Sequence, residues 1–154
     1  MKARHMLILG MLLASGILLA DGPRMPREVD TTWQQECGSC HLAFPPSMLI
    51  ADNWRRMMAG LDKHFGANAS LDEITAAKIT AFLERNASTR SERNASSTLR
   101  ITDTRWFVRE HDEVSPAIWR DPKIRSAANC AACHRGADRG LYNEHDIVIP
   151  VTRR

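Results

Sequence analysis

The feature that most constrains this chain is a pair of Cys-x-x-Cys-His motifs, CGSCH at residues 37–41 and CAACH at residues 130–134. Two thiols three positions apart, followed at once by an imidazole, form the attachment signature of a c-type haem. On one helical turn the two sulfurs can reach the vinyl groups of a porphyrin edge, and the adjacent His can bind the iron. With 4 Cys and 6 His in 154 residues, chance would supply one such pentapeptide only about 0.004 times. The pair therefore predicts two covalently bound haem c groups.

The motif residues divide between two roles. The predicted thioether ligands are Cys37, Cys40, Cys130 and Cys133, and the predicted proximal iron ligands are His41 and His134. Two alternatives remain open at this point. A zinc site usually has its second Cys pair within a short loop, whereas 90 residues separate Cys40 from Cys130. A thioredoxin-like dithiol normally lies in a βαβ context, which this sequence does not contain.

Residues 1–20 are typical of an export signal. Lys2 and Arg4 give a positive start, and an apolar run follows from Met6 to Leu19. The run is shorter than a membrane span requires, so we expect a cleaved signal peptide and a periplasmic protein. Leu18 is unusual at the third position before the cut, and an uncleaved membrane anchor is the alternative. Export also suits c-type haem, which is attached after the chain has crossed a membrane.

The charge of the chain gives little reason to expect a nucleic-acid partner. The formal net charge is +3, and removal of Lys2 and Arg4 with the signal lowers the 21 basic side chains to 19, against 18 acidic ones. Four haem propionates would bring the holoprotein to a net charge of about −3. We therefore expect no nucleic-acid binding. We expect no small-molecule substrate either, because two His ligands on each iron would leave no open position for one.

The remaining chain predicts a mostly α protein with two cytochrome c-like helical lobes, each built around one covalent haem. We expect a first haem lobe at 31–85, a polar linker at 86–100 and a second haem lobe at 101–151, which ends in a short extended tail. A lobe of this size buries little apolar surface by itself, so its haem has to serve as its core.

Helices are predicted in both lobes from apolar spacing and capping residues. In the first lobe they cover 33–41 with Thr31 or Thr32 as cap, 52–65, and a segment from the Ser70 capping box to about Arg85. In the second lobe they cover a segment through 106–111 capped by Asp103 or Thr104, a short turn opened by Ser115-Pro116, and 124–134.

Each iron needs a second axial ligand, and the sequence offers one inward-facing His in each half. His64 follows an apolar stripe at helical spacing, and His111 follows Phe107 and Val108. His64 lies 23 residues after His41, and His111 lies 23 residues before His134. We therefore predict His64 and His111 as the distal iron ligands.

Other candidates for the distal positions are weaker. The competing thioethers are Met48, Met57 and Met58 of the first half. We interpret Met57 and Met58 as pocket wall rather than as ligands, because Met fills cores more often than it binds metal. No Met follows Met58, so the second half has no thioether of its own to offer. His145 lies between Glu144 and Asp146, and we expect it to be solvated.

The chain resembles the bacterial dihaem cytochrome c family of small periplasmic proteins from about residue 33 to residue 150. Besides the two haem motifs, the resemblance rests on residues 40–48 (CHLAFPPSM), 60–66 (GLDKHFG), 106–111 (WFVREH) and 149–150 (IP). It implies a mostly helical protein with two bis-His haems that carries electrons and does no chemistry on a metabolite. It also implies redox partners: a soluble monohaem oxygen-binding cytochrome and a membrane b-type cytochrome.

The predicted function is thus electron transfer by a periplasmic dihaem c-type cytochrome. Bis-His ligation lacks the thioether that raises the potential of Met/His cytochromes, so we expect low reduction potentials. The alternatives are a small peroxidase-like haem enzyme with one open iron, and a Cys-x-x-Cys dithiol oxidoreductase.

Overall fold

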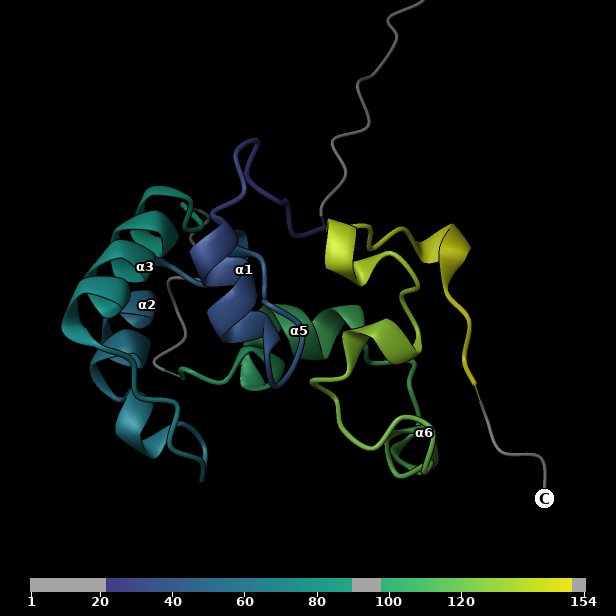
Figure 1. Ribbon diagram of the computed structural model, residues 1–154. Helices are drawn as coiled ribbons and strands as arrows, with labels where there is room; N and C mark the ends of the chain where they lie inside the picture. The colour runs from purple at the N-terminus through teal and green to yellow at the C-terminus, as the bar shows by residue number, and fades with distance from the viewer. Residues whose placement is uncertain (1–21, 90–97, 151–154) are drawn as a thin grey trace, which may run out of the picture.

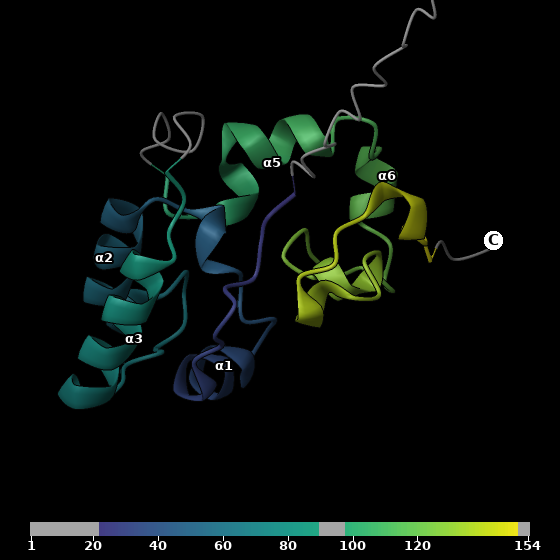
Figure 2. The same cartoon turned by 90° about the horizontal axis from the view of Figure 1, so that it is seen from above.

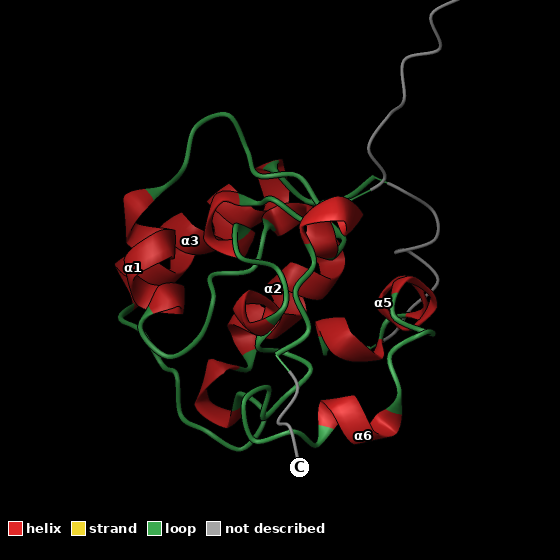
Figure 3. Ribbon diagram, turned by 90° about the vertical axis from the view of Figure 1, so that its right-hand side faces the viewer, coloured by secondary structure: helices red, strands yellow, loops and turns green. Residues whose placement is uncertain are grey.

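The computed structural model describes residues 22–89 and 98–150, so the predicted signal peptide, part of the polar linker and the last four residues lie outside it. Within these ranges the chain forms short helices joined by long loops, and it contains no strand (Figure 3). The mostly α fold predicted from the sequence is confirmed. No helix in the described ranges is long and apolar enough to cross a membrane.

The first half is organised around three helices, α1 (Thr31–Gly38), α2 (Ala51–Ala59) and α3 (Glu73–Arg85). Helix α3 packs against both α1 and α2, as the left side of Figure 1 shows. Trp33 of α1 meets Phe82 of α3 with ring centroids 5.2 Å apart. Burial of each such apolar side chain contributes about 1.5–3 kcal/mol. The buried core of this half comprises Trp33, Ala43, Met48, Leu49, Trp54, Met57, Ile79, Phe82, Leu83 and Ile101.

The caps of α1 and α3 differ from the predicted ones. Asp30, and not Thr31 or Thr32, caps α1, and its carboxylate accepts a hydrogen bond of 3.0 Å from the Trp33 N–H. Asp72, and not Ser70, caps α3 by accepting from the Thr75 N–H at 3.0 Å. An Asp carboxylate competes well with a hydroxyl for these N–H groups because its charge also suits the positive end of the helix.

The predicted helix over 52–65 is wrong in its second half. Helix α2 ends at Ala59, and Gly60 follows as its C-cap, donating from its N–H to the Met57 carbonyl at 3.1 Å. A separate 3-10 turn, η2 (Leu61–Lys63), comes next. Gly is unfavourable inside a helix and common just after its end, so Gly60 ends the helix although the apolar spacing continues.

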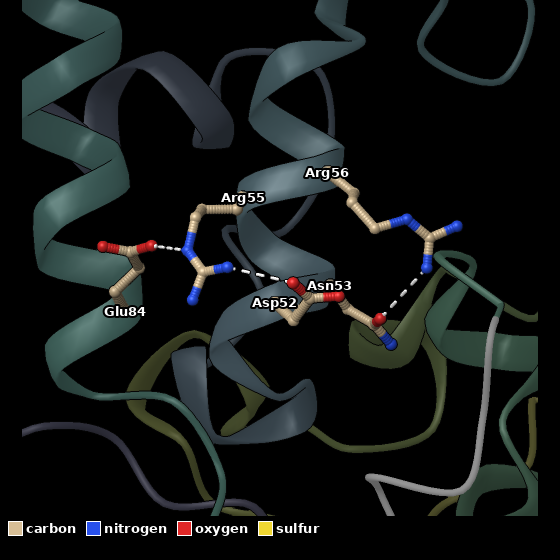
Figure 4. Close-up of polar contacts among 5 residues, drawn as sticks. All are labelled: Asp52, Asn53, Arg55, Arg56 and Glu84. Carbon is tan, nitrogen blue, oxygen red and sulfur yellow. Dashed lines mark hydrogen bonds and ion pairs between the residues drawn. The ribbon is translucent and has the colours of Figure 1, made fainter.

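Figure 4 shows the polar contacts of helix α2, which carries exposed charged side chains and one buried Asn. Arg55 pairs with Asp52 at 2.9 Å and with Glu84 of α3. Arg55 and Asp52 are exposed and Glu84 is half-buried, and ion pairs at such surface positions contribute little to stability. Asn53 is buried, and its amide donates to the Thr98 carbonyl at 3.2 Å. This bond connects α2 to Thr98, the first residue that the structure describes after residue 89.

The second half has less regular structure. Its helices are α5 (Arg105–Glu110) and α6 (Pro116–Trp119), with 3-10 turns η3 (Ile101–Asp103), η4 (Cys130–Ala132), η5 (Ala137–Arg139) and η6 (Glu144–Asp146). Figure 2 shows α6 and the loops of this half on the side of the molecule away from α3. The predicted starts of both helices are confirmed: Thr104 caps α5, and Ser115 precedes Pro116 at the first position of α6.

The predicted helix over 124–134 is wrong, because only η4 is helical there. Polar side chains bind the local backbone in its place: Asp121 Oδ1 accepts from the Lys123 N–H at 2.9 Å, and Ser126 Oγ accepts from the Ala128 N–H at 3.1 Å. Such bonds compete with helix formation. Arg125 also adopts a φ of +66°, which a right-handed helix cannot accommodate.

The two halves are joined through η3. Ile101 is buried and belongs to the core of the first half, although the predicted second lobe begins at residue 101. The division into two lobes at 31–85 and 101–151 stays a prediction.

Candidate haem sites

The first Cys-x-x-Cys-His motif begins on the last turn of α1. Helix α1 ends at Gly38, and Ser39 Oγ donates to the Glu36 carbonyl at 2.8 Å. Cys40 and His41 therefore lie in the turn after the helix, and the predicted helix over 33–41 is too long at its end. Burial of Trp33 fixes the orientation of α1 against α3. His41 Nδ1 lies 2.7 Å from the Leu42 carbonyl oxygen.

His64 lies beside His41, as an iron shared by the two would require. The ring centroids are 6.1 Å apart and the ring planes differ by 21°. The predicted reason for this placement is wrong, since His64 follows η2 and is not on α2. A tight turn directs it instead, in which the Ala67 N–H donates to the His64 carbonyl at 3.0 Å.

The second motif folds as a single turn around η4. The His134 N–H donates to the Cys130 carbonyl at 2.8 Å, which is the bond of one helical turn. The C-terminal tail holds this turn from outside, because the Val148 N–H donates to the Cys133 carbonyl at 3.1 Å. An isolated β-bridge also joins His134 to Ile147. The described part of the tail, residues 147–150, is extended, as predicted.

His111 is the C-cap of α5 and lies beside His134. Their ring centroids are 6.2 Å apart, with ring planes at 80°. His111 Nδ1 lies 2.8 Å from the Phe107 carbonyl oxygen. Aromatic rings lie around the pair. Between ring centroids, Phe107 and Trp119 are 4.0 and 5.9 Å from His111, and Tyr142 is 5.3 Å from His134.

Both imidazole pairs have the ring separation that two ligands of one iron require. A metal–imidazole nitrogen bond is about 2.0 Å long, so two axial imidazoles on one metal have ring centroids about 6 Å apart. The measured separations are 6.1 Å and 6.2 Å. In each pair the Nδ1 of one ring is hydrogen-bonded to a backbone carbonyl. This ring is His41 in the first pair and His111 in the second. Such a bond fixes the tautomer in which Nε2 is free to bind a metal. The Nδ1 atoms of His64 and His134 are buried without a hydrogen-bond partner among the described residues.

The electrostatics of the two sites favour neutral imidazoles. Burial lowers the pKa of His64, and the nearby His41 and Arg100 lower it further. Burial, together with His111, lowers the pKa of His134. A neutral ring keeps the lone pair that metal binding requires.

The thiols do not have the properties of a reactive dithiol. All four cysteines are free, and burial raises the pKa of Cys37 and of Cys130 to about 11. Catalytic Cys-x-x-Cys thiols have a lowered pKa, because the thiolate is the nucleophile. The zinc alternative fares no better, since no three His, Cys, Asp or Glu side chains gather as a metal cluster in residues 22–89 and 98–150. A zinc site in a protein normally takes four ligands.

The two motifs border a common space. An open cavity of about 600 Å³ is lined by Gly38, Cys40 and His41 of the first motif and by Ala131 of the second. Asn129 and Arg125 line it from the second half. Residues of the two motifs therefore lie around the same cavity.

The other candidates for iron ligation are elsewhere. His145 is exposed in η6, and Met48 and Met57 are buried in the first core, with Met58 packed against it. Sequence reasoning did not find three residues near the paired rings: Tyr142, Trp119 as a neighbour of His111, and Arg100. Phe107 precedes His111 by one helical turn, which the spacing does show. Arg100 stands at the end of a polar stretch, and nothing in the local sequence marks it.

The helical chain with two Cys-x-x-Cys-His turns defines the class of the protein, a c-type cytochrome with two haem sites. Residues 33–142 match the model of the family described as dihaem cytochrome c. The chain belongs to the dihaem cytochrome c family. It therefore carries two covalently bound haem c groups, as predicted, and the zinc and dithiol alternatives no longer hold.

Solved structures agree with this assignment. The chain is 45% identical to DHC purified from Rhodobacter sphaeroides, with a TM-score of 0.66 over 75% of this chain and 98% of that one. A second structure, the diheme cytochrome c from Rhodobacter sphaeroides, is 43% identical, with a TM-score of 0.68 over 74% and 97% of the two chains. The diheme cytochrome type c from Shewanella baltica OS155 is 37% identical, with a TM-score of 0.69 over 78% and 92%. No curated protein matches the chain.

Proposed function

We propose that this protein is a periplasmic electron carrier in which both irons are six-coordinate with two His ligands each. His41 and His64 hold the first iron, and His134 and His111 hold the second. Each bound haem supplies a one-electron iron couple. The observation that carries the proposal is the separation of the two ring pairs, 6.1 Å and 6.2 Å, which suits two axial imidazoles on one iron.

The roles of the surrounding residues follow from this assignment. The carbonyls of Leu42 and Phe107 orient one ring in each pair. Phe107, Trp119 and Tyr142 exclude water from the second imidazole pair. A site without water shifts the relative stability of ferric and ferrous iron. The cavity shared by the two motifs supports electron exchange between neighbouring haems inside one chain.

The proposed setting is the periplasm, with export by residues 1–20. The proposed partners are a membrane b-type cytochrome as donor and a soluble monohaem oxygen-binding cytochrome as acceptor. With both axial positions filled by protein, neither iron has an open site for a substrate. A peroxidase-like enzyme requires one such site.

The test is carbon monoxide binding to the reduced holoprotein, since only an open iron takes it readily. We expect no binding to the wild type, and one high-spin, carbon monoxide-binding haem in each of His64→Ala and His111→Ala. His145→Ala is the matched control and should leave the spectrum unchanged, because His145 is exposed in η6. Binding by the wild type would favour the enzyme. An opened iron in His145→Ala but not in His111→Ala would show that the tail supplies the ligand.

A further inference from the structure

The distal ligand of the first haem is presented by a backbone turn that its sequence does not favour. Phe65 and Gly66, the two central residues of the His64–Ala67 turn, have φ values of +48° and +100°. Positive φ at both central positions is typical of a type I′ turn, which Gly, Asn and Asp favour. Gly66 suits it, but a bulky residue with positive φ is an outlier. Such outliers persist only when neighbouring groups hold them in place.

Arg100 contacts the Phe65 ring. Its guanidinium carbon lies 4.2 Å from the centroid of the Phe65 ring, within the range of a cation–π contact. The centroid of the Phe65 ring is also 4.8 Å from that of the His64 ring. Arg100, Phe65 and His64 therefore form a continuous chain of contacts that ends at the predicted iron ligand.

The backbone of Arg100 is anchored to other parts of the first half. Its N–H lies 3.3 Å from Thr98 Oγ1, and the Thr98 carbonyl accepts from the buried Asn53 amide of α2 at 3.2 Å. The next residue, Ile101, is buried in the core of the first half. Arg100 Nε also lies 3.7 Å from an Asp103 carboxylate oxygen, and both of these side chains are largely exposed. The position of the guanidinium thus depends on a well-anchored backbone more than on its surface ion pair.

We propose that Arg100 is the positioning residue of the first haem: through Phe65 it holds the His64 turn closed, and its positive charge raises the reduction potential of that haem. The inference rests on the ligation by His64 proposed above. A fixed positive charge favours the state in which the iron carries less positive charge, which is the reduced one. Only the Phe65 ring lies between this charge and the ligand in the chain of contacts, since Phe65 is 4.2 Å from the guanidinium carbon and 4.8 Å from the His64 ring.

The experiment is a spectroelectrochemical titration of the holoprotein as wild type, Arg100→Gln, Arg100→Lys and Arg105→Gln. In Arg100→Gln we expect the reduced-to-oxidised ratio of one haem at fixed potential to fall about fivefold, which is about 41 mV for a one-electron couple. The affected redox wave should be the one that His64→Ala alters. Arg100→Lys keeps the charge and should recover most of the ratio. Arg105→Gln makes the same change in net charge at an exposed site of α5 and should leave the first haem unchanged.

A second variant tests the route through Phe65. Phe65→Leu removes the aromatic ring, so Arg100→Gln should have a smaller effect in that background than in the wild type. The inference is overturned if Arg100→Gln moves neither wave, if Arg105→Gln moves the first wave equally, or if the two variants at 65 and 100 act additively. It is also overturned if Arg100→Gln and Arg100→Lys lose the first haem alike, because the role would then be structural. A wild type that already contains high-spin iron would overturn the proposed ligation itself, and that result is read before any variant.

Discussion

The substitution Thr104→Val tests how the fold holds His111. Thr104 is 1% exposed and caps α5, the six-residue helix that has His111 as its C-cap. Its hydroxyl accepts from the Phe107 N–H at 3.2 Å and donates to the Ile101 carbonyl at 2.7 Å. A helix this short is not stable alone, so its cap and its packing determine its position.

The magnitude follows from these two bonds. Loss of a side-chain N-cap costs about 1 kcal/mol. The Ile101 carbonyl keeps a second donor, the Thr104 N–H at 3.2 Å, so the other lost bond adds at most about 1 kcal/mol. Val has nearly the same shape as Thr and leaves no cavity. We therefore expect Thr104→Val to lower the free energy of unfolding by about 1–2 kcal/mol.

The assay is urea unfolding of the holoprotein followed by circular dichroism, with carbon monoxide binding as a local readout of His111. The matched control is Thr80→Val, because the half-buried Thr80 hydroxyl donates only to the Ala76 carbonyl of its own helix at 2.7 Å. Its loss should cost less than about 0.5 kcal/mol. Equal effects of the two substitutions, without carbon monoxide binding in Thr104→Val, would refute the role assigned to the cap.

Two further predictions concern haem attachment and acid stability. Cys133→Ala should leave about one stable haem per chain, or an unstable protein that is degraded, and haem quantification by absorbance checks this; two stable covalent haems would contradict it. The hydrogen bond from the Trp33 N–H, together with the charge of Lys78, lowers the pKa of Asp30 from its usual value of 3.8. The ionised carboxylate therefore stabilises the fold above pH 3.8, and this contribution is lost as the pH falls through the pKa of the folded state. Asp30→Ala should therefore destabilise the protein by about 1 kcal/mol at pH 7, and the difference should shrink in unfolding curves taken below pH 3.8; a difference that grows in acid would show the sign to be wrong.

The sequence predicted the chemistry of this protein better than its backbone. The Cys-x-x-Cys-His spacing is local and tied to one attachment reaction, so it predicted the two covalent haem c groups and the family, and the family match confirms both. The starts of α5 and α6 followed from a capping residue, Thr104, and from a proline, Pro116. Each lies within one stretch of sequence.

The errors occur where a local signal was overruled by a neighbour. The apolar spacing from Trp54 to Phe65 continues past Gly60, which ends α2. Between 124 and 134, bonds from Asp121 and Ser126 and the positive φ of Arg125 replace the predicted helix.

Contacts between distant segments left no signal in the sequence. The backbone of Arg100 is held through Thr98 to Asn53, 45 residues earlier, and its side chain reaches Phe65. No periodicity or cap in the linker indicates either contact. His64 was predicted as a distal ligand, but the turn that places it beside His41 contains Phe65, and the contact of Phe65 with Arg100 has no local sequence signal.

The most direct test of the central claim is the spectrum of the purified wild-type holoprotein, with haem quantified per chain and with electron paramagnetic resonance of the oxidised form. The account predicts two haems per chain, both low-spin, and no change on addition of carbon monoxide to the reduced protein. The ring planes meet at 21° in one pair and at 80° in the other, so the two irons should give two distinct low-spin signals. A high-spin signal from either iron, or carbon monoxide binding by the wild type, would contradict the account.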